Sequence, residues 1–406
     1  MTGAAAGEGG GDAGGLRGMR VCVVRHACFP ADPTVRKEVR ALVAAGCDVD
    51  VLCLRGEGEL AREAVEGARV IRLPLTHRRA GVARYLAEYG ASLLLATAAL
   101  AWLALRRRYH LVQVNTMPDA LVFATVVPRL LGARVVLHLH EPTPELWLTK
   151  YGPHRLRLLH GLQVRVEQAA IRYAHASLTV SQALRGRYVE RGAEPGRLTV
   201  LRNVCDESFA PAAPPASAEP GFRLVMHGLV EERCGQGTLL EAVRLVADEL
   251  PGLSVEILGD GPFRPALEDR VRAAGLADRV SLPGFLPFDE LLRRLRRADA
   301  GVVPMTRTPY SELVDTTKMY EYVALGIPVI ASRLPVVEDT FAGDAVAYFE
   351  PGDAAGLAAR IRELYHAPER RRALAGAAAR RYEGIRWREQ QKVYTGVIAR
   401  VAGRAA

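Results

Sequence analysis

The sequence predicts an α/β protein of two Rossmann-like units, each with a mainly parallel sheet, that face each other across a cleft. Short apolar runs alternate with amphipathic helical segments along the chain. The alternation stops at a Pro/Ala-rich stretch, residues 210–221, and then starts again. Alternating strands and helices are typical of doubly wound sheets, whose ligands bind beyond the carboxyl ends of the strands.

The pattern divides the chain into five segments. Residues 1–18 are rich in Gly and Ala and are expected to form a disordered tail. Residues 19–209 form the first unit, 210–221 a linker, 222–384 the second unit, and 385–406 a C-terminal helix.

Apolar runs bounded by turn residues predict the strands, and helical periodicity predicts the helices. In the first unit, strands are expected at 19–26, 48–54, 69–73, 111–115, 134–139 and 176–180, with a helix at 34–46. In the second unit, strands are expected at 222–228, 254–262, 279–285, 300–305, 326–332 and 345–351, with helices at 237–250, 289–298 and 318–325.

The composition excludes several classes of protein. With 406 residues, 49% of them hydrophobic and 24% charged, the chain is globular rather than disordered. Its six cysteines include no C-x-x-C pair, which argues against a zinc ribbon or a thioredoxin-type redox site. The first residues contain no apolar run, so we expect no signal peptide and a cytoplasmic location. No aspartate-rich metal-binding motif stands out in the sequence, so no metal is expected.

The positive charge is concentrated in the first half. Residues 19–205 contain 27 Lys and Arg against 15 Asp and Glu, whereas residues 206–406 contain 26 against 28. This imbalance has two interpretations. The protein binds an anionic partner, or its surface is merely rich in arginine because the genome that encodes it has a biased composition.

The uncharged stretch 91–105 is followed by three arginines and is too short to span a bilayer. A buried core helix and an interfacial helix are both open interpretations. An interfacial helix would place the protein peripherally on the inner face of an anionic membrane. We expect no nucleic-acid partner.

The segment 311–332 carries the clearest chemical signal. Asp315, Thr316 and Thr317 suit the start of a helix, whose free N–H groups and positive dipole end favour a diphosphate. Lys318 adds a full charge in the first turn, and Glu321 lies on the same helix face, where it would accept hydrogen bonds from a ribose diol. A simple surface Lys–Glu pair is the alternative.

Two other segments supply further candidates. Arg233 lies in a glycine turn between a strand and a helix, where a guanidinium would clamp a phosphate. His140 and Glu141 follow the apolar strand 134–139, where a histidine would orient or protonate a bound group. A solvated loop histidine is the alternative there. His26 ends the first strand of the chain.

In their order along the chain, these segments resemble the family 4 glycosyltransferases, which have the GT-B fold and retain the anomeric configuration. The resemblance is carried by HGLVEERCG, LGDGP, RVSLPGFLPFDEL, ADAGVVP and KMYEYVALGIPVIAS in the second half, and by VVLHLHEPTPEL in the first. RWREQQKVY resembles the helix that returns to the first domain in that family.

The resemblance implies a nucleotide-diphosphate-sugar donor, held mainly by the second unit, and a glycosyl acceptor that is lipid-linked, a polysaccharide or a small molecule. It implies no cofactor. On this sequence the implied donor-binding residues are Gly228, Arg233, Gly284, Phe285, Thr316, Thr317, Lys318 and Glu321, with His140, Arg233 and Lys318 in catalytic roles and His26 and Glu141 on the acceptor side.

The sequence departs from the family pattern at a functional position. Many members have a second glutamate eight residues before the position of Glu321, where this chain has Leu313, and Glu312 is one residue away. The segment resembles a subgroup in which Lys-x-x-Glu replaces the usual pair of glutamates. A degenerate scaffold for another transferase and a nucleotide-sugar epimerase are therefore kept as alternatives.

Overall fold

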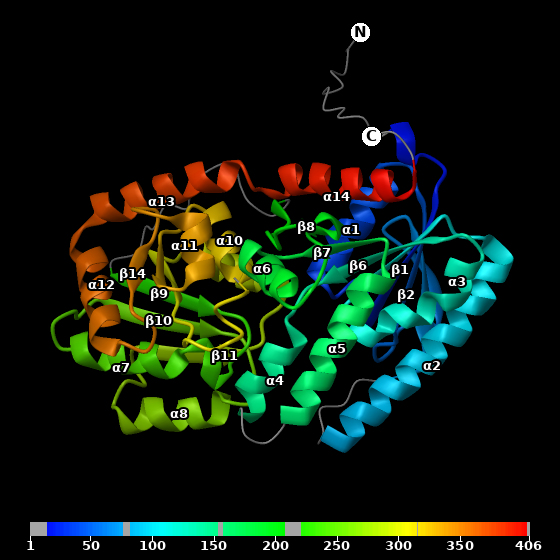
Figure 1. Ribbon diagram of the computed structural model, residues 1–406. Coiled ribbons are helices and arrows are strands. Elements are labelled where there is room, and N and C mark those ends of the chain that lie inside the picture. Colours follow the sequence, from blue (N-terminus) through cyan, green and yellow to red (C-terminus); the bar gives the residue numbers. More distant parts are fainter. Residues whose placement is uncertain (1–13, 76–81, 153–156, 208–220, 315, 404–406) are drawn as a thin grey trace, which may run out of the picture. The chain divides into compact units, whose positions relative to one another are not determined.

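The computed structural model describes residues 14–75, 82–152, 157–207, 221–314 and 316–403. The chain divides into two compact units: residues up to Arg202 together with those from Arg388 onward, and residues Asn203–Trp387. Of the predicted linker 210–221, all but the last residue lies outside the described residues. Figure 1 labels the elements of both units.

The first unit contains an eight-stranded sheet with the order β3-β4-β2-β1-β5-β6-β7-β8. All pairs are parallel except β3 with β4. Its strands are β1 (Arg20–Cys28), β2 (Asp48–Leu54), β3 (Arg62–Val65), β4 (Ala68–Leu73), β5 (Leu111–Asn115), β6 (Arg134–Leu139), β7 (Ala176–Thr179) and β8 (Leu198–Val200). Its helices are η1 (Gly14–Leu16), α1 (Pro33–Ala44), α2 (Val82–Arg107), η2 (Asp119–Thr125), α3 (Val126–Leu130), α4 (Thr143–Tyr151), α5 (Arg157–Tyr173), α6 (Gln182–Glu190), η3 (Pro195–Arg197) and most of α14 (Trp387–Val401).

Helices cover both faces of this sheet. On one face Gln113 of β5 bonds to Glu38 of α1 and accepts a hydrogen bond from Tyr394 of α14. On the other face His26 of β1 bonds to Ser92 of α2. The C-terminal helix therefore belongs to the first unit, to which the family resemblance assigned it.

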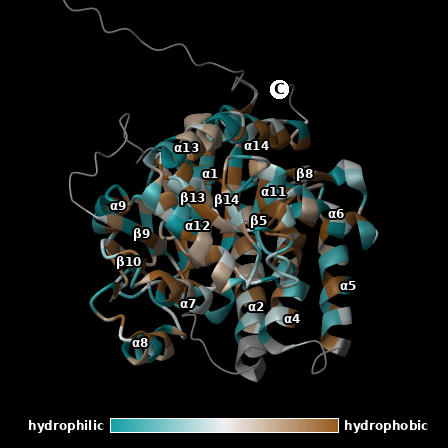
Figure 2. Ribbon diagram, turned by 90° about the vertical axis from the view of Figure 1, so that its left-hand side faces the viewer, coloured by the Kyte–Doolittle hydropathy of each residue, from teal (hydrophilic) through white to brown (hydrophobic). Residues whose placement is uncertain are grey.

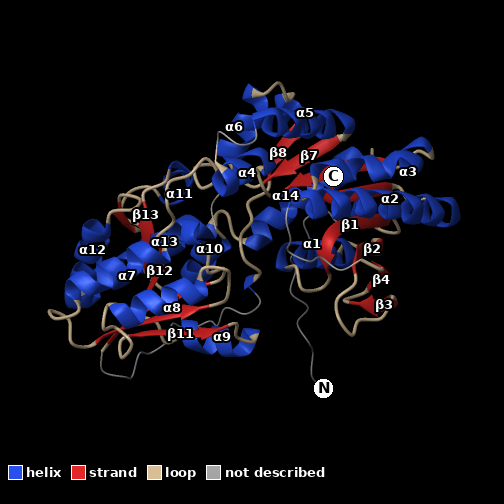
Figure 3. Ribbon diagram, turned by 90° about the horizontal axis from the view of Figure 1, so that it is seen from below, coloured by secondary structure: helices blue, strands red, loops and turns tan. Residues whose placement is uncertain are grey.

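The second unit contains a six-stranded parallel sheet with the order β11-β10-β9-β12-β13-β14. Its strands are β9 (Phe222–His227), β10 (Leu253–Leu258), β11 (Val280–Gly284), β12 (Ala300–Val303), β13 (Val329–Ser332) and β14 (Ala347–Phe349). Its helices are η5 (Glu232–Cys234), α7 (Gln236–Val246), α8 (Arg264–Ala273), α9 (Phe288–Leu295), α10 (Thr317–Ala324), α11 (Pro335–Phe341), α12 (Ala354–His366) and α13 (Pro368–Glu383). Figure 3 shows the strands in red between these helices.

Alternating side chains of β9 supply two separate cores. Leu224 and Met226 pack in a cluster with residues of α7 and α12, whereas Val225 packs with residues of α10 and α13. Each fully buried aliphatic side chain of this kind contributes about 1.5–3 kcal/mol to the free energy of unfolding. Helices α5 and α8 show alternating hydrophilic and hydrophobic bands, as amphipathic helices on a sheet do (Figure 2).

The predicted class, α/β with two Rossmann-like units and parallel sheets, is confirmed. The strand order reverses beside β1 in the first sheet and beside β9 in the second, because the chain adds strands first on one side and then on the other. Such switch points create the crevices in which ligands of doubly wound sheets bind. The cleft between the two units stays a prediction.

The structure corrects one prediction about the first unit and rules out one of two interpretations that the sequence left open. Residues 14–18, assigned to the disordered tail, include η1, and Leu16 is buried against the unit while its carbonyl accepts a bond from Cys47. The stretch 91–105 is not a buried core helix, since only 28% of Glu88–Arg107 is buried. By length and composition alone this is a helix that could cross a membrane.

Candidate active site

The candidate donor site lies at the switch point of the second sheet, where β9 leads into a glycine turn. Gly228 follows β9 with a φ of +100°, and Gly235 precedes α7 with a φ of +82°. A Cβ on Gly235 would lie 1.7 Å from the carbonyl oxygen of Pro304, so only glycine allows this close approach to the loop after β12. The two glycines thus bring the loops after β9 and β12 together.

Lys318, from the first turn of α10, lies directly against Gly228. A Cβ on Gly228 would be 2.3 Å from Cε of Lys318 and 2.9 Å from its Nζ. The ammonium group therefore lies beside the backbone that follows β9. This is the position in which a cation meets an anionic ligand at the carboxyl end of a parallel strand.

Arg233 lies in the same turn and is held in place from several sides. Its Nε donates to Glu231 at 2.6 Å, and its guanidinium lies over the ring of Tyr310, 4.8 Å from the centroid. Its carbonyl accepts hydrogen bonds from the backbone N–H and the hydroxyl of Thr306. The guanidinium is thus oriented before any ligand arrives.

The two cations are close enough to affect each other. Burial lowers the pKa of Lys318, interactions with Cys234 and with the carboxylate of Glu321 oppose this shift, and the positive charge of Arg233 lowers the pKa further. Glu231 already offsets part of this positive charge through its ion pair with Arg233, and a bound diphosphate would add further compensating negative charge.

Glu321 pairs with a histidine rather than forming a simple surface pair with Lys318. Its Oε2 lies 2.5 Å from Nε2 of His227, and Nδ1 of His227 lies 2.9 Å from the hydroxyl of Tyr322. Glu321 remains partly exposed, with 28% of its side chain accessible. Sequence reasoning missed His227, although it stands at the end of β9 immediately before Gly228.

Helix α10 starts where the sequence predicts, but the side chain of Thr316 does not cap it. Thr316 occupies the N-cap and Thr317 the first helical position, whereas Asp315 lies outside the described residues. The Thr316 side chain makes no capping hydrogen bond with the described part of the chain. The first backbone amides of α10 are therefore not capped by the Thr316 side chain.

The remaining donor-site candidates lie at the end of β11. Gly284 has a φ of +84°, and Phe285 after it is 82% exposed. In the segment before α10, Leu313 is buried, and Glu312 forms an ion pair with Arg307 at 3.1 Å. Glu312 is therefore engaged elsewhere and does not take the place of the glutamate that the family pattern has at position 313.

In the first unit, His140 is a buried residue and not a solvated loop histidine. Its Nε2 lies 3.0 Å from Oδ1 of Asn115, and its backbone N–H donates to the hydroxyl of Thr116. Burial, followed by the positive charges around it, holds the pKa of His140 well below its ordinary value. The imidazole is therefore neutral at physiological pH and suits a positioning role better than that of a proton donor.

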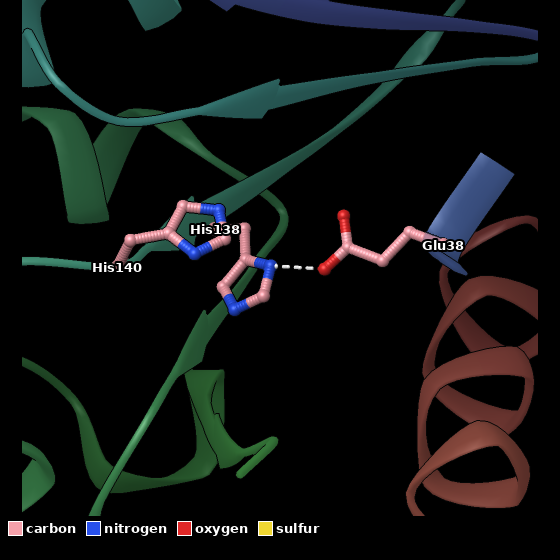
Figure 4. Close-up of side chains that lie close together, drawn as sticks. All are labelled: Glu38, His138 and His140. Carbon is pink, nitrogen blue, oxygen red and sulfur yellow. Dashed lines mark ion pairs between the residues drawn. The ribbon is translucent and has the colours of Figure 1, made fainter. Parts of the chain in front are cut away.

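His140 stacks on His138, and His138 is paired with Glu38 of α1 (Figure 4). The ring centroids of the two histidines are 3.9 Å apart, and Nδ1 of His138 lies 2.7 Å from Oε1 of Glu38. Gln113 donates to the other oxygen of Glu38 at 2.7 Å. Sequence reasoning missed Glu38 and His138.

Glu38, His138 and His140 offer ligand atoms within 4.8 Å of one another, which is the spacing of a metal site. However, the Glu38 carboxylate is engaged by His138 and Gln113, and His140 by Asn115. These partners engage the Glu38 carboxylate and His140 without an ion, whereas Nε2 of the buried His138 has no hydrogen-bond partner in the described part of the chain. The absence of a metal stays a prediction.

The acceptor-side candidates lie at the end of β1 and after β6. Nδ1 of His26 lies 2.7 Å from the hydroxyl of Ser92, and its ring contacts Tyr89 edge-on. His26 also lines a cavity of about 380 Å³ together with Cys28, Leu54 and the residues just after β2. Glu141 is half-buried. His26 thus lies at a cavity of the first unit.

Two family models match the chain: "Glycosyl transferase 4-like domain" over residues 31–204 and "Glycosyl transferases group 1" over residues 221–367. Among curated proteins, the sulfoquinovosyl transferase SQD2 of Arabidopsis thaliana is 27% identical over 292 residues, covering 67% of this chain and 53% of that protein. Glycogen synthase of Mycobacterium tuberculosis is 28% identical over 218 residues, covering 53% of this chain and 51% of that protein. The chain thus matches about half the length of these relatives.

Among solved structures, sucrose-phosphate synthase from Thermosynechococcus elongatus aligns with a TM-score of 0.75 at 21% identity, over 94% of this chain and 98% of that one. The catalytic domain of starch synthase IV from Arabidopsis thaliana aligns with a TM-score of 0.72 at 14% identity, over 95% of this chain and 100% of that one. These alignments confirm the GT-B fold. The protein therefore belongs to the glycosyltransferase family described by the 4-like and group 1 models, the first spanning most of its first unit and the second most of its second.

Proposed function

We propose that this protein is a retaining glycosyltransferase that moves a sugar from a nucleotide-diphosphate sugar to an acceptor hydroxyl. One observation carries the proposal: Lys318 lies against Gly228 at the switch point of the second sheet, close enough to Arg233 of the same turn for the two charges to interact. A relative's structure, Anabaena HepE, was solved with UDP-glucose, which supports a donor of this class.

The proposed chemistry is electrostatic. Cleavage of the sugar–phosphate bond leaves negative charge on the departing nucleotide diphosphate. Lys318, Arg233 and the first amides of α10 would stabilise this charge, as preorganised donors do for other developing anions. The acceptor oxygen bonds to the anomeric carbon on the face that the diphosphate leaves, and its proton passes to a diphosphate oxygen.

The remaining site residues bind and orient the donor. Glu321 would accept hydrogen bonds from the ribose diol, and exposed Phe285 would stack on the base. His140, a neutral imidazole fixed by Asn115, would position the donor sugar. We further propose that Lys318 and Glu321 form the Lys-x-x-Glu version of the family's donor motif, in which the buried Leu313 replaces a sugar-binding carboxylate.

A thermal-shift screen tests the donor site. The full chain is heated with UDP, ADP or GDP, and with the corresponding nucleosides. A ligand that binds only the folded state at a hundredfold excess over its Kd stabilises that state by about 2.7 kcal/mol. We expect one diphosphate to raise the Tm strongly, its nucleoside to do so weakly, and Lys318→Ala to abolish most of the difference.

The alternatives give different results. A degenerate scaffold would show no saturable shift with any diphosphate, and this result would overturn the proposal. An epimerase would change the sugar donor in the absence of any acceptor, which NMR of the donor detects. A transferase of the proposed kind leaves the donor unchanged until an acceptor is added, and then gives a product with the donor's anomeric configuration.

A further inference from the structure

The outer side of helix α2 is apolar where a helix on the surface of a soluble protein is normally polar. Between residues 91 and 105 its exposed positions are Leu94, Leu95, Ala98, Trp102 and Leu105, which recur at helical spacing. Leu94 is 73% exposed and Leu105 is 67% exposed. We call these five residues the α2 stripe. They lie within a stretch of the helix that contains no charged residue.

The inner side of the same helix is fixed to the first unit. Ala96 and Leu100 are almost fully buried, and the hydroxyl of Ser92 bonds to His26 of β1. The helix therefore lies along the flank of a folded unit. A bilayer-spanning position would require these contacts to be broken, so the helix suits the plane of a membrane surface rather than a crossing.

The C-terminal end of the stripe is basic. The guanidinium of Arg106 lies 4.1 Å from the centroid of the Trp102 ring, and that of Arg62 lies 5.3 Å from it. A cavity of about 340 Å³ opens beside this ring, and Arg62, Arg69 and Arg107 are among its lining residues. Arg69 and Arg107 also pair with Asp48 and Asp50, which partly offsets their charge.

A neighbouring helix adds to the exposed apolar surface. Helices α2 and α3 lie side by side (Figures 1 and 3). Leu130 at the end of α3 is 81% exposed, and Val126 at its start is 42% exposed. Exposed leucines next to a tryptophan and arginines match the apolar, interfacial and phosphate layers of an anionic bilayer.

We propose that the α2 stripe docks in the plane of an anionic phospholipid bilayer, with Leu94 and Leu105 among the acyl chains and Arg62 and Arg106 at the phosphates. His26, which lines the candidate acceptor cavity, is bonded to the same helix. A docked α2 thus brings that cavity close to the lipid headgroups, so the acceptor belongs to the class of membrane lipids. This last point rests on the proposed function, whereas the docking itself does not.

Vesicle co-sedimentation of the full chain tests the docking without any substrate. We expect binding to vesicles of phosphatidylglycerol mixed with phosphatidylcholine, and much weaker binding to pure phosphatidylcholine. The double variant Leu94→Ser/Leu105→Ser loses two large apolar contacts and should bind at least about tenfold more weakly. Arg62→Ala and Arg106→Ala should each weaken binding about fivefold and reduce its salt dependence.

Matched controls lie outside the stripe. Leu162→Ser in α5 and Leu245→Ser in α7 remove leucines that are 54% and 42% exposed, and Arg272→Ala removes an exposed arginine of the second unit. These variants should bind vesicles like the wild type. An unchanged Tm for each variant confirms that it folds. Equal losses for the stripe and control variants would overturn the proposal.

Tryptophan fluorescence reports the site directly. The chain has three tryptophans, Trp102, Trp147 and Trp387. Brominated lipids should quench the wild type, and this quenching should disappear in Trp102→Phe. No binding to anionic vesicles, or quenching that persists in Trp102→Phe, would overturn the docking. A wild type that fails to bind vesicles but self-associates through Leu94 and Leu105 would show that the stripe is a protein interface instead.

Discussion

The side chain of Lys318 occupies the space that a Cβ on Gly228 would need, since that Cβ would lie 2.3 Å from Cε of the lysine. A glycine is therefore required after β9 for two reasons. The backbone there has a φ of +100°, and the side chain of Lys318 fills the space that a Cβ would occupy. The candidate diphosphate site depends on both members of the pair, one from the turn after β9 and one from the start of α10.

Gly228→Ala should displace Lys318 and weaken binding of the nucleoside diphosphate at least about tenfold, because it moves the ammonium off the site. It should also cost about 1 kcal/mol of stability through its positive φ. Calorimetry and denaturant unfolding measure the two effects. Gly275→Ala is the control, since Gly275 also has a positive φ, +67°, but open space around it. Equal binding by the two variants would refute the steric argument.

Lys318→Ala should lower turnover about a hundredfold, since the loss of one preorganised donor to a developing anion has that order of effect. Steady-state kinetics with the identified donor gives the value. Lys392→Ala is the matched control, because Lys392 is an exposed lysine of α14 that pairs with Glu389. Unchanged turnover in Lys318→Ala would remove the lysine from the mechanism.

Glu321→Ala should abolish discrimination between ribose and deoxyribose. A hydrogen bond to a carboxylate is worth about 1.5–3 kcal/mol, so the wild type should prefer the ribonucleoside diphosphate over its 2′-deoxy form by about tenfold or more. In the variant the two affinities should become equal. Glu338→Ala, on α11, should keep the preference. A preference that survives in Glu321→Ala would place the ribose elsewhere.

Asp119 should make the first unit less stable as the pH rises. Burial, and then the charge of Glu167, raises the pKa of Asp119 to about 7 from an ordinary value of 3.8. Between these two values the folded state holds a proton that the unfolded state has lost, so the free energy of unfolding decreases as pH rises through this window. Asp119→Asn should flatten the dependence of the urea midpoint on pH, whereas exposed Asp248→Asn should leave it unchanged. An unaltered slope in Asp119→Asn would contradict the assignment.

Much of the fold was predictable because apolar runs mark buried strands. The predicted bounds of β2, β5 and β6 agree with the structure to the residue. The sequence prediction missed β3 and β8 for a physical reason. Strand β3 is short, partly exposed, and pairs with β4 alone at the edge of the sheet, and β8 has only three residues at the other edge. Neither strand needs a continuous apolar run.

The candidate site was predictable only where its residues are close in sequence. Thr316, Thr317, Lys318 and Glu321 follow one another along α10, and Gly228 and Arg233 share one turn. His227 pairs with Glu321 across 94 positions of sequence, and Gln113 contacts Glu38 across 75. Each pair joins a strand to a helix that packs on the sheet, and this tertiary packing is not encoded in local sequence patterns.

The helix α14 returns to the first unit after the second unit has been completed, since residues Asn203–Trp387 form one continuous segment. Tyr394 supplies a hydrogen bond to Gln113 in the middle of the first sheet. During synthesis on the ribosome, the unit that is started first is therefore the last to be finished. A nascent chain must keep its amino-terminal half soluble while the other half folds, and that half stays incomplete until the 15 residues of α14 have been made.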